Sequence, residues 1–329
     1  MEKASKFYDK VKFVRPTISK DKVRRFVLGS KDKQGVVTQL VKYVLLIGIG
    51  FVYLYPLLYM ISTSFMSLED LLDTSIKWIP SQFYPDNFQN AFRVMDFWGS
   101  FKDSLLIAGV PTLIQVVVCA FVGYGFARFE FKGKKLMMGI LLFSFILPPQ
   151  ITMMPNYVLY TDLGLIGSIK SFIYPALLGQ GLKSQIFILI FYQFFRQVPQ
   201  ALIEAAQIDG AGYFKSFLRI AIPSATPAIL VVFLFSIVWY WNESYLATLY
   251  ITGNGKAATS DLTTLVVQLK NFETNYDAYA ASGQQQMANI NESIKMAGTM
   301  LSILPLLIMY AFLQKQFVES VDRTGITGE

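Results

Sequence analysis

The stretch Ser104-Leu-Leu-Ile-Ala-Gly-Val-Pro-Thr-Leu-Ile-Gln-Val-Val-Val-Cys-Ala-Phe-Val-Gly-Tyr-Gly-Phe-Ala127 runs for 24 residues without a charge. A helix needs about 20 predominantly apolar residues to cross the hydrocarbon core of a bilayer. Five further stretches have the same character: 43–68, 136–161, 171–195 (interrupted only by Lys183), 220–255 (interrupted only by Glu243) and 296–314. So many uncharged stretches leave no polar face for water. The sequence therefore predicts an all-α integral membrane protein with six transmembrane helices.

Composition agrees with a membrane protein and excludes several kinds of catalysis. Hydrophobic residues make up 53% of the 329-residue chain and charged residues only 16%, whereas soluble domains carry about 25% charged residues. The chain has no histidine and a single cysteine, Cys119. These counts exclude a disulfide framework and a His-based zinc site, and they disfavour haem binding and Ser-His-Asp or Cys-His catalysis. We expect no catalytic residues, no metal, no cofactor and no nucleic-acid partner.

Basic residues predict the orientation of the chain in the membrane. With the N-terminus inside, the inner segments 1–37, 128–135, 195–224 and 315–329 hold 20 Lys and Arg, of which the first supplies 11. The outer segments 66–103, 161–170 and 251–293 hold 6. Because cytoplasmic loops carry the excess of Lys and Arg, both termini are expected in the cytoplasm.

This orientation divides the chain into three parts. Residues 1–37 are expected to form a solvated cytoplasmic arm that also touches anionic lipid, residues 38–318 the transmembrane domain, and residues 319–329 a cytoplasmic tail. The outer loop 66–103 is rich in aromatic residues and prolines, which suits a cap at the membrane surface. The outer loop 251–293 is polar, and it either reaches toward a partner or is a flexible connection.

The sequence contains no motif for binding nucleotide. Gly253-Asn-Gly-Lys256 lacks both the first glycine of a P-loop and the Ser or Thr after its lysine. Energy for transport must then come from an ion gradient or from another subunit. Ion-driven carriers bury several acids in their spans, and Glu243 is the one acid clearly within a span here.

The inner loop 198–223 has the pattern of two short helices joined at a glycine. Pro199 suits a helix start, and Gly210 can adopt positive φ and end that helix. Phe214, Phe217 and Leu218 follow at the i, i+3, i+4 spacing of a second helix. From these residues alone, a docking element for another protein and an ordinary amphipathic linker are equally well supported.

The same residues resemble a known motif. Glu204-Ala205-Ala206, three residues, Gly210, nine residues, and then Ile220-Ala221-Ile222-Pro223 are similar to the EAA loop in permease subunits of ATP-binding-cassette importers, with Ile222 in place of leucine. The turn Tyr124-Gly-Phe-Ala-Arg128-Phe-Glu-Phe-Lys132-Gly133, the stretch Leu163-Gly164-Leu165-Ile166 and Trp241-Asn242-Glu243 resemble the carbohydrate-importing branch, of the maltose permease G type. The tail 317–328 departs from the ending common in that branch, which puts a tail contact with the ATPase in doubt.

The resemblance implies a function and a set of partners. It implies a permease subunit in a bacterial or archaeal plasma membrane, which translocates a sugar or oligosaccharide. The implied partners are a second permease, two cytoplasmic ATPase subunits, an external sugar-binding protein docking at 251–293, and membrane lipid. The residues implied in coupling to the ATPase are Leu202, Glu204, Ala205, Ala206, Asp209, Gly210, Phe214, Phe217 and Pro223. The alternatives are an ion-coupled secondary carrier and a multi-span membrane enzyme or scaffold.

Polar residues within the spans are candidates for the solute path. An acid such as Glu243 costs about 2.5–3.5 kcal/mol at the centre of a bilayer, so it should face a polar cavity or a partner. Polar groups beside irregular backbone are tolerated at membrane depth where they line water or a site. The candidates are Gln150, Asn156, Tyr157, Tyr160, Lys183, Gln185, Asn242 and Glu243. The alternative is that Asn242 and Glu243 cap or bridge helices and that Lys183 snorkels outward.

The predicted topology can be tested with single cysteines at Ser81, Gly210 and Gln285 in a Cys119→Ala background. In intact cells an impermeant thiol reagent should label positions 81 and 285 and spare position 210, because basic loops stay inside. Labelling of position 210 from outside, with 81 and 285 protected, would overturn the topology.

Overall fold

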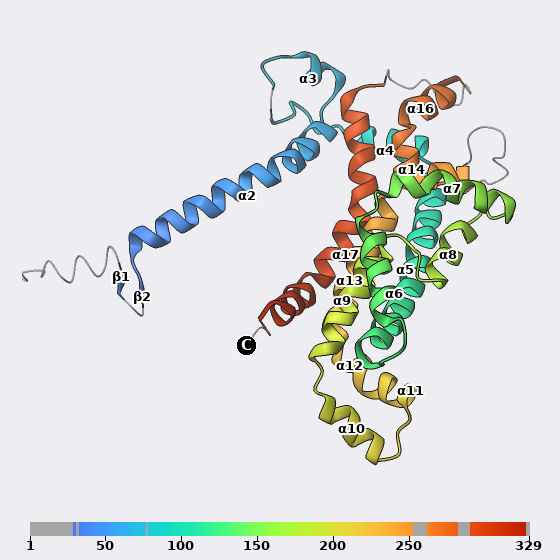
Figure 1. Cartoon of the computed structure of the whole chain (residues 1–329). Coiled ribbons are helices and arrows are strands. Elements are labelled where there is room, and N and C mark those ends of the chain that lie inside the picture. Colours follow the sequence, from blue (N-terminus) through green and yellow to red (C-terminus); the bar gives the residue numbers. More distant parts are fainter. Residues whose placement is uncertain (1–28, 31–32, 77, 253–261, 282–289, 327–329) are drawn as a thin grey trace, which may run out of the picture. The chain divides into compact units, whose positions relative to one another are not determined.

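The computed structural model describes residues 29–30, 33–76, 78–252, 262–281 and 290–326. The chain divides after Tyr59 into two units, Met1–Tyr59 and Met60–Glu329, which are considered separately (Figure 1). In the first unit, strands β1 (Gly29–Ser30) and β2 (Lys33–Gln34) pair antiparallel, with Gly29 opposite Gln34. Helix α2 (Val36–Ser64) follows and continues into the second unit. Residues 1–28 of the predicted basic arm lie outside the described residues.

The all-helical class that the sequence predicts is confirmed for the described residues. The two strands have only two residues each, and a period-2 pattern needs about four or more residues to be recognised in a sequence. Every other regular element among the described residues is a helix.

The second unit contains a succession of helices along the chain. In order they are α3 (Leu68–Leu72), α4 (Asp86–Val94), α5 (Phe97–Arg128), α6 (Lys134–Ile146), α7 (Pro149–Asp162), α8 (Lys170–Leu177), α9 (Ser184–Gln197), α10 (Gln200–Ile208), α11 (Tyr213–Ser216), the π-helical turn η2 (Phe217–Ala221), α12 (Ile222–Ser224), α13 (Thr226–Asn242), α14 (Ser244–Ala247), the π-helical turn η3 (Thr248–Thr252), α15 (Leu265–Lys270), α16 (Phe272–Ala281) and α17 (Glu292–Ile326). Helix α17 runs without a break across residue 318, where the tail was predicted to begin.

The described residues provide three to six candidate membrane spans. Helices α2 and α5 and residues 292–319 of α17 are each long and apolar enough to cross a bilayer alone. Three further pairs reach that length only together: α6 with α7 bent by 101°, α9 with α10 bent by 73°, and residues 213–224 with α13 bent by 76°. Counting each bent pair as one span gives six candidates. The predicted spans 171–195 and 220–255 divide the chain differently from these pairs, because α10 and residues 213–223 fall in the predicted inner loop.

Three of the predicted spans are not continuous helices. The stretch 136–161 breaks at Pro148, since a proline keeps the preceding residue out of the helical conformation, and Leu147 is extended with ψ 127°. The stretch 171–195 breaks between Leu177 and Ser184. The stretch 220–255 ends its long helix at Asn242. A count of uncharged residues does not detect such breaks, because apolar residues fill helices and bends alike.

Helix α5 forms the centre of the second unit. It packs against α9, α13 and α8, and buried side chains lie along it in two clusters, one containing Ile107 and Ala108 and the other Cys119 and Ala120. The contact with α9 is closest at Gly123, where an added Cβ would lie 2.6 Å from Cβ of Phe191 and 3.0 Å from the carbonyl oxygen of Ile188. Small residues allow two helix backbones to approach in this way within a membrane.

The predicted outer loop 66–103 is structured in its described residues. The buried side chain of Asn87 donates to the carbonyl oxygens of Ser64 (3.0 Å) and Met66 (2.8 Å). The carboxylate of Asp70 accepts from the backbone amide and hydroxyl of Ser81. Stacked rings join α4 to α5, with the centroids of Phe92 and Phe97 4.7 Å apart.

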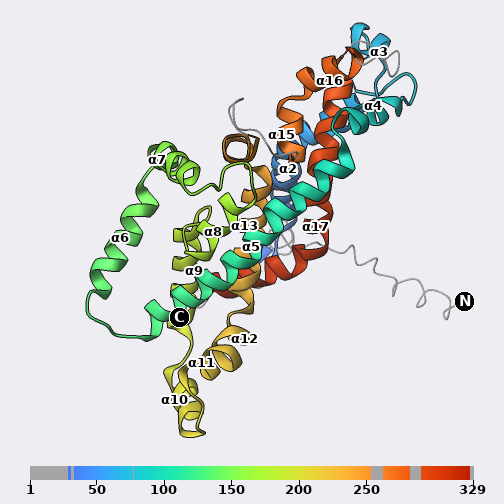
Figure 2. The same cartoon turned by 90° about the vertical axis from the view of Figure 1, so that its right-hand side faces the viewer.

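The helices of the predicted inner loop 198–223 and of the predicted outer loop 251–293 lie at opposite ends of the second unit. Figures 1 and 2 show α10 and α11 at one end and α16 at the other, with α5 running between them. Of the polar loop 251–293, helices α15 and α16 are described, and residues 253–261 and 282–289 lie outside the described part.

The contact at Gly123 can be tested against a glycine two residues away on the same helix. Gly123→Ala should destabilise the purified protein by about 1–3 kcal/mol, because the methyl group overlaps the backbone of α9. Gly125 has no atom within 4 Å of an added Cβ, so Gly125→Ala should leave stability unchanged or raise it by up to about 1 kcal/mol. Thermal unfolding in detergent provides the comparison, and equal shifts for the two variants would contradict the packing.

Candidate functional site

The loop 198–223 leaves α9 at a sharp corner and returns through two short helices. Helix α9 ends at Gln197, Val198 and Pro199 are extended with ψ 125° and 130°, and α10 begins at Gln200. Proline cannot donate a backbone hydrogen bond, and it disfavours a helical conformation at the residue before it, here Val198. Pro199 thus starts α10 as predicted, from the capping position just before its first residue.

Gly210 closes α10 in the way that its position predicts. Its φ is +78°, in the left-handed region that favours glycine. The amide of Gly210 donates to the carbonyl of Gln207 (3.0 Å) and that of Ala211 to Ala206 (2.8 Å), so carbonyls at the end of the helix are satisfied. An added Cβ on Gly210 would meet nothing within 4 Å. Backbone conformation, and not space, therefore demands glycine here.

Most of the residues implied in ATPase coupling are exposed. Leu202, Glu204, Ala205, Asp209, Gly210, Phe214 and Pro223 are exposed, and Ala206 is half-buried. Two large apolar residues that the sequence analysis did not single out are exposed beside them, namely Ile208 (86% exposed) and Tyr213. The available signal was an isoleucine directly before Asp209-Gly210 at the helix end.

Phe217 does not belong to this exposed surface. Its side chain is 7% exposed, whereas that of Phe214 is 64% exposed. The ring of Phe217 packs 4.9 Å from that of Tyr124 and 6.3 Å from that of Phe195. The rings of Phe214 and Phe217 are neighbours, with centroids 6.5 Å apart, but the ring of Phe217 lies on the inner side of the pair and that of Phe214 on the exposed side.

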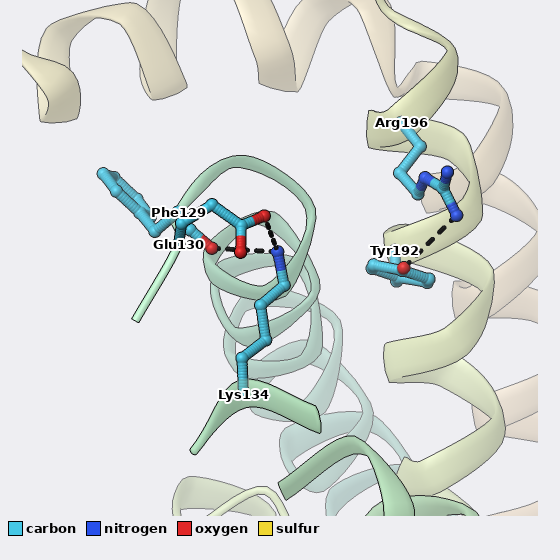
Figure 3. Close-up of polar contacts among 5 residues, drawn as sticks. All are labelled: Phe129, Glu130, Lys134, Tyr192 and Arg196. Carbon is cyan, nitrogen blue, oxygen red and sulfur yellow. Dashed lines mark hydrogen bonds and ion pairs between the residues drawn. The ribbon is translucent and has the colours of Figure 1, made fainter. Parts of the chain in front are cut away.

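The turn between α5 and α6 is closed by polar contacts next to this loop. The ammonium of Lys134 donates to the carboxylate of Glu130 (2.7 Å) and to the carbonyl of Phe129 (3.0 Å), as Figure 3 shows. On α9, Arg196 donates to the hydroxyl of Tyr192 within its own helix (3.3 Å). Exposed contacts of this kind contribute at most about 1 kcal/mol each.

Four of the solute-path candidates lie on α7, beyond the bend at Pro148. Gln150 is exposed, and Asn156, Tyr157 and Tyr160 are half-buried. The ring of Tyr160 packs against that of Tyr250 with centroids 5.1 Å apart. In the part of the chain that the structure describes, no side-chain hydrogen bond joins any two of the eight candidates.

Lys183 and Gln185 follow the break between α8 and α9. Two buried side chains hold this break: Gln115 donates to the carbonyl of Leu182 (2.6 Å), and the amide of Leu182 donates to the hydroxyl of Tyr240 (3.2 Å). Lys183 has φ +59°, an unusual conformation for a lysine, and its side chain is exposed while that of Gln185 is half-buried. The sequence analysis missed Gln115 and Tyr240, because a single polar residue in an apolar stretch gives no spacing signal.

Glu243 caps a helix. Its carboxylate accepts hydrogen bonds from the amides of Tyr245 (3.1 Å) and Leu246 (2.9 Å) at the start of α14, the usual role of an N-cap acceptor. The alternative that Glu243 caps a helix therefore describes its contacts, and these amides supply the polar surroundings that an acid needs. Asn242, beside it, is exposed.

The sequence and the fold of this chain are similar to those of known transport proteins. Residues 115–323 match the family described as the binding-protein-dependent transport system inner membrane component. Protein LplC of Bacillus subtilis is 30% identical over 90% of this chain and 97% of its own. The polygalacturonan/rhamnogalacturonan transport system permease protein YtcP of the same organism is 25% identical over 87% and 96%. A crystal structure of a bacterial transporter for the acidic polysaccharide alginate contains a chain with the same fold, at a TM-score of 0.69 and 21% identity over 85% of this chain and 96% of that one.

The chain belongs to the family of inner-membrane components of binding-protein-dependent transport systems. It is a multi-pass permease subunit of a prokaryotic ATP-binding-cassette importer, with the fold of such permeases. Separate subunits hydrolyse the ATP, and the system depends on a binding protein. The alternatives of a secondary carrier and of a membrane enzyme are thereby set aside.

Proposed function

We propose that this permease translocates a sugar or oligosaccharide as one half of a heterodimer. In this proposal a second permease forms the other half, two ATPase subunits bind from the cytoplasm, and a sugar-binding protein delivers the substrate from outside. The printed names of several relatives support a saccharide, among them YtcP and an arabinooligosaccharide permease of Halalkalibacterium halodurans that is 26% identical over 85% of this chain.

The proposal includes an orientation in the membrane. Six spans cross it, with both termini and the loop 198–223 in the cytoplasm and the loops 66–103 and 251–293 outside. Residues 1–37 form a basic arm beside anionic lipid, residues 38–318 the transmembrane domain, and residues 319–329 a cytoplasmic tail. The separation of α10 and α16 at opposite ends of the second unit supports this assignment (Figure 2).

The exposed surface of α10 and α11 carries the coupling proposal. Leu202, Ile208 and Phe214 are large apolar side chains that face solvent at one end of the unit. Such side chains suit the centre of a protein interface, and we assign this surface to a cleft on the ATPase. Glu204 pairs there with a basic group of the ATPase, and Gly210 sets the angle between the two short helices. Ala205, Ala206, Asp209 and Pro223 complete the element, with Phe217 inside it as packing.

The solute path is assigned to the polar groups beside the broken helices. Irregular backbone at membrane depth is tolerated where it is buried in protein or lines a cavity. At the break 178–183, the side chains of Gln115 and Tyr240 bond the backbone of Leu182. The residues assigned to the path are Gln150, Asn156, Tyr157, Tyr160, Lys183, Gln185, Asn242 and Glu243, the last through its helix cap. Lys183 supplies a cation, which favours an acidic saccharide.

Coupling can be tested with two glycines of the same loop. Gly210→Val forces a β-branched residue into positive φ, which is strongly disfavoured, whereas Gly212 has φ −66° and open space around it, so Gly212→Val serves as the control. In the reconstituted importer, Gly210→Val should lower substrate uptake by about tenfold, the factor for a strain of 1–2 kcal/mol. Gly212→Val should transport substrate nearly as fast as the parent does. Parental uptake by both variants would show that the loop is a passive linker.

The solute path can be tested by charge. Lys183→Ala should lower the uptake of a uronate-containing oligosaccharide by about tenfold, the effect of losing one hydrogen bond to a charged group, and should affect a neutral oligosaccharide less. Lys170→Ala is the control, since Lys170 is an exposed lysine at the start of α8. Equal uptake of both substrates by the two variants and the parent, at equal membrane abundance, would remove Lys183 from the path.

A further inference from the structure

Arg128, the last residue of α5, binds the corner where α9 turns into α10. Its guanidinium Nη2 donates to the carbonyl oxygen of Val198. This carbonyl ends α9, and the last carbonyls of a helix have no partner within the helix. The bond crosses from one helix to another, 70 residues apart in the chain.

Arg128 makes this bond while another of its nitrogen atoms has no hydrogen-bond partner. In the part of the chain that the structure describes, no ion pair is formed by Arg128, and its Nε is buried without a hydrogen-bond partner. Leaving a buried polar atom without a hydrogen-bond partner costs free energy. An arginine that served only to keep the surface soluble would not carry this cost. The negative end of the α9 dipole offers the cation a favourable partner at Val198.

The other end of the loop is held by the neighbours of Arg128. The ring of Phe129 lies edge-on to that of Tyr213 at 5.4 Å, and the ring of Tyr124 lies 4.9 Å from that of Phe217. Tyr124 also packs against Phe195, at 5.3 Å. The segment 124–129 therefore contacts the chain just before α10 and again just after it.

These contacts make the end of α5 the support of α10. Helix α10 has one buried residue, Ile203, and Gly210 beyond it has no neighbour within 4 Å of an added Cβ. A force applied to the exposed residues of α10 must reach the spans through its two ends. Segment 124–129 contacts the chain at both of these ends.

We propose that Arg128 is the positioning residue that transmits movement of the α10–α11 element to α5. The proposal rests on the assignment of that element to the ATPase. The hydrogen bond at Val198 fixes the direction in which α9 and α5 are held together, because a guanidinium holds its donors in a rigid planar fork. The aromatic contacts, by contrast, allow the rings to slide over one another. Without the bond, α10 can move with the ATPase while the corner at Val198 no longer pulls α5.

The test compares Arg128→Met and Arg128→Lys with Arg196→Met in the complete importer in proteoliposomes. Arg196 is the matched control, since it is an exposed arginine near the same corner that bonds within its own helix (Figure 3). The ATP hydrolysed per substrate imported, for equal amounts of inserted complex, should rise by about tenfold in Arg128→Met, the factor for one hydrogen bond to a charged group. Arg128→Lys should recover part of the coupling, and Arg196→Met should match the parent.

A second measurement applies even where Arg128→Met inserts poorly. Nitroxide labels at two exposed positions, Lys132 and Gln200, in a Cys119→Ala background, report the distance between the end of α5 and the start of α10. The distribution of label-to-label distances should broaden in Arg128→Lys and stay narrow in Arg196→Met.

The outcomes separate this inference from the proposed function. Coupling and distance unchanged in both Arg128 variants would overturn it. A proportional fall in hydrolysis and uptake, with no recovery by lysine, would reduce Arg128 to a structural residue and also overturn it. If Gly210→Val uncouples the importer and Arg128→Met does not, only the inference fails. If Gly210→Val has no effect, the coupling assignment fails, and the label distances still decide whether Arg128 holds the corner.

Discussion

The close contact of α5 and α9 at Gly123 is the constraint on which the second unit depends. The two backbones approach closely there, and one buried cluster continues the contact with Cys119 of α5 and Phe187, Phe191 and Phe195 of α9. A second buried cluster contains Ile107 and Ala108 of α5 with residues of α8 and α13. Without water in the bilayer, such packing and a few polar bonds between helices provide the specificity of association. Helix α5 is therefore both the central support and the route between the two ends.

Side chains of other helices satisfy the backbone at one of the broken spans. At the break before α9, Gln115 and Tyr240 bond both polar groups of Leu182. An added Cβ on Gly181 would lie 2.7 Å from the Gln115 amide oxygen and 2.6 Å from the Tyr240 hydroxyl, so a glycine is required for this approach. The same bonds direct the chain into Lys183. Irregular structure at this depth is thus supported by particular side chains on α5 and α13.

The two ends of the second unit differ in the polarity of their exposed residues. One end carries exposed apolar residues on α10 and α11, held by α5 at both sides of the loop. The other end carries α15 and α16 with polar surfaces, joined to α5 where the amide of Leu265 donates to the hydroxyl of Ser104 (2.8 Å). Helix α5 therefore contacts both ends of the unit.

The amino-acid sequence alone determined the class of protein, since uncharged stretches, basic loops and the spacing from Glu204 to Pro223 are local features that need no knowledge of neighbours. It also predicted the helix–glycine–helix element and the positive φ of Gly210. Only the tertiary structure decided that Phe217 is buried, that Glu243 caps α14, and that Arg128 meets Val198. Each of these depends on a contact or a cap. Residues far apart in the chain, such as Gln115 and Leu182, meet only when the helices pack, and no spacing along the sequence records that meeting.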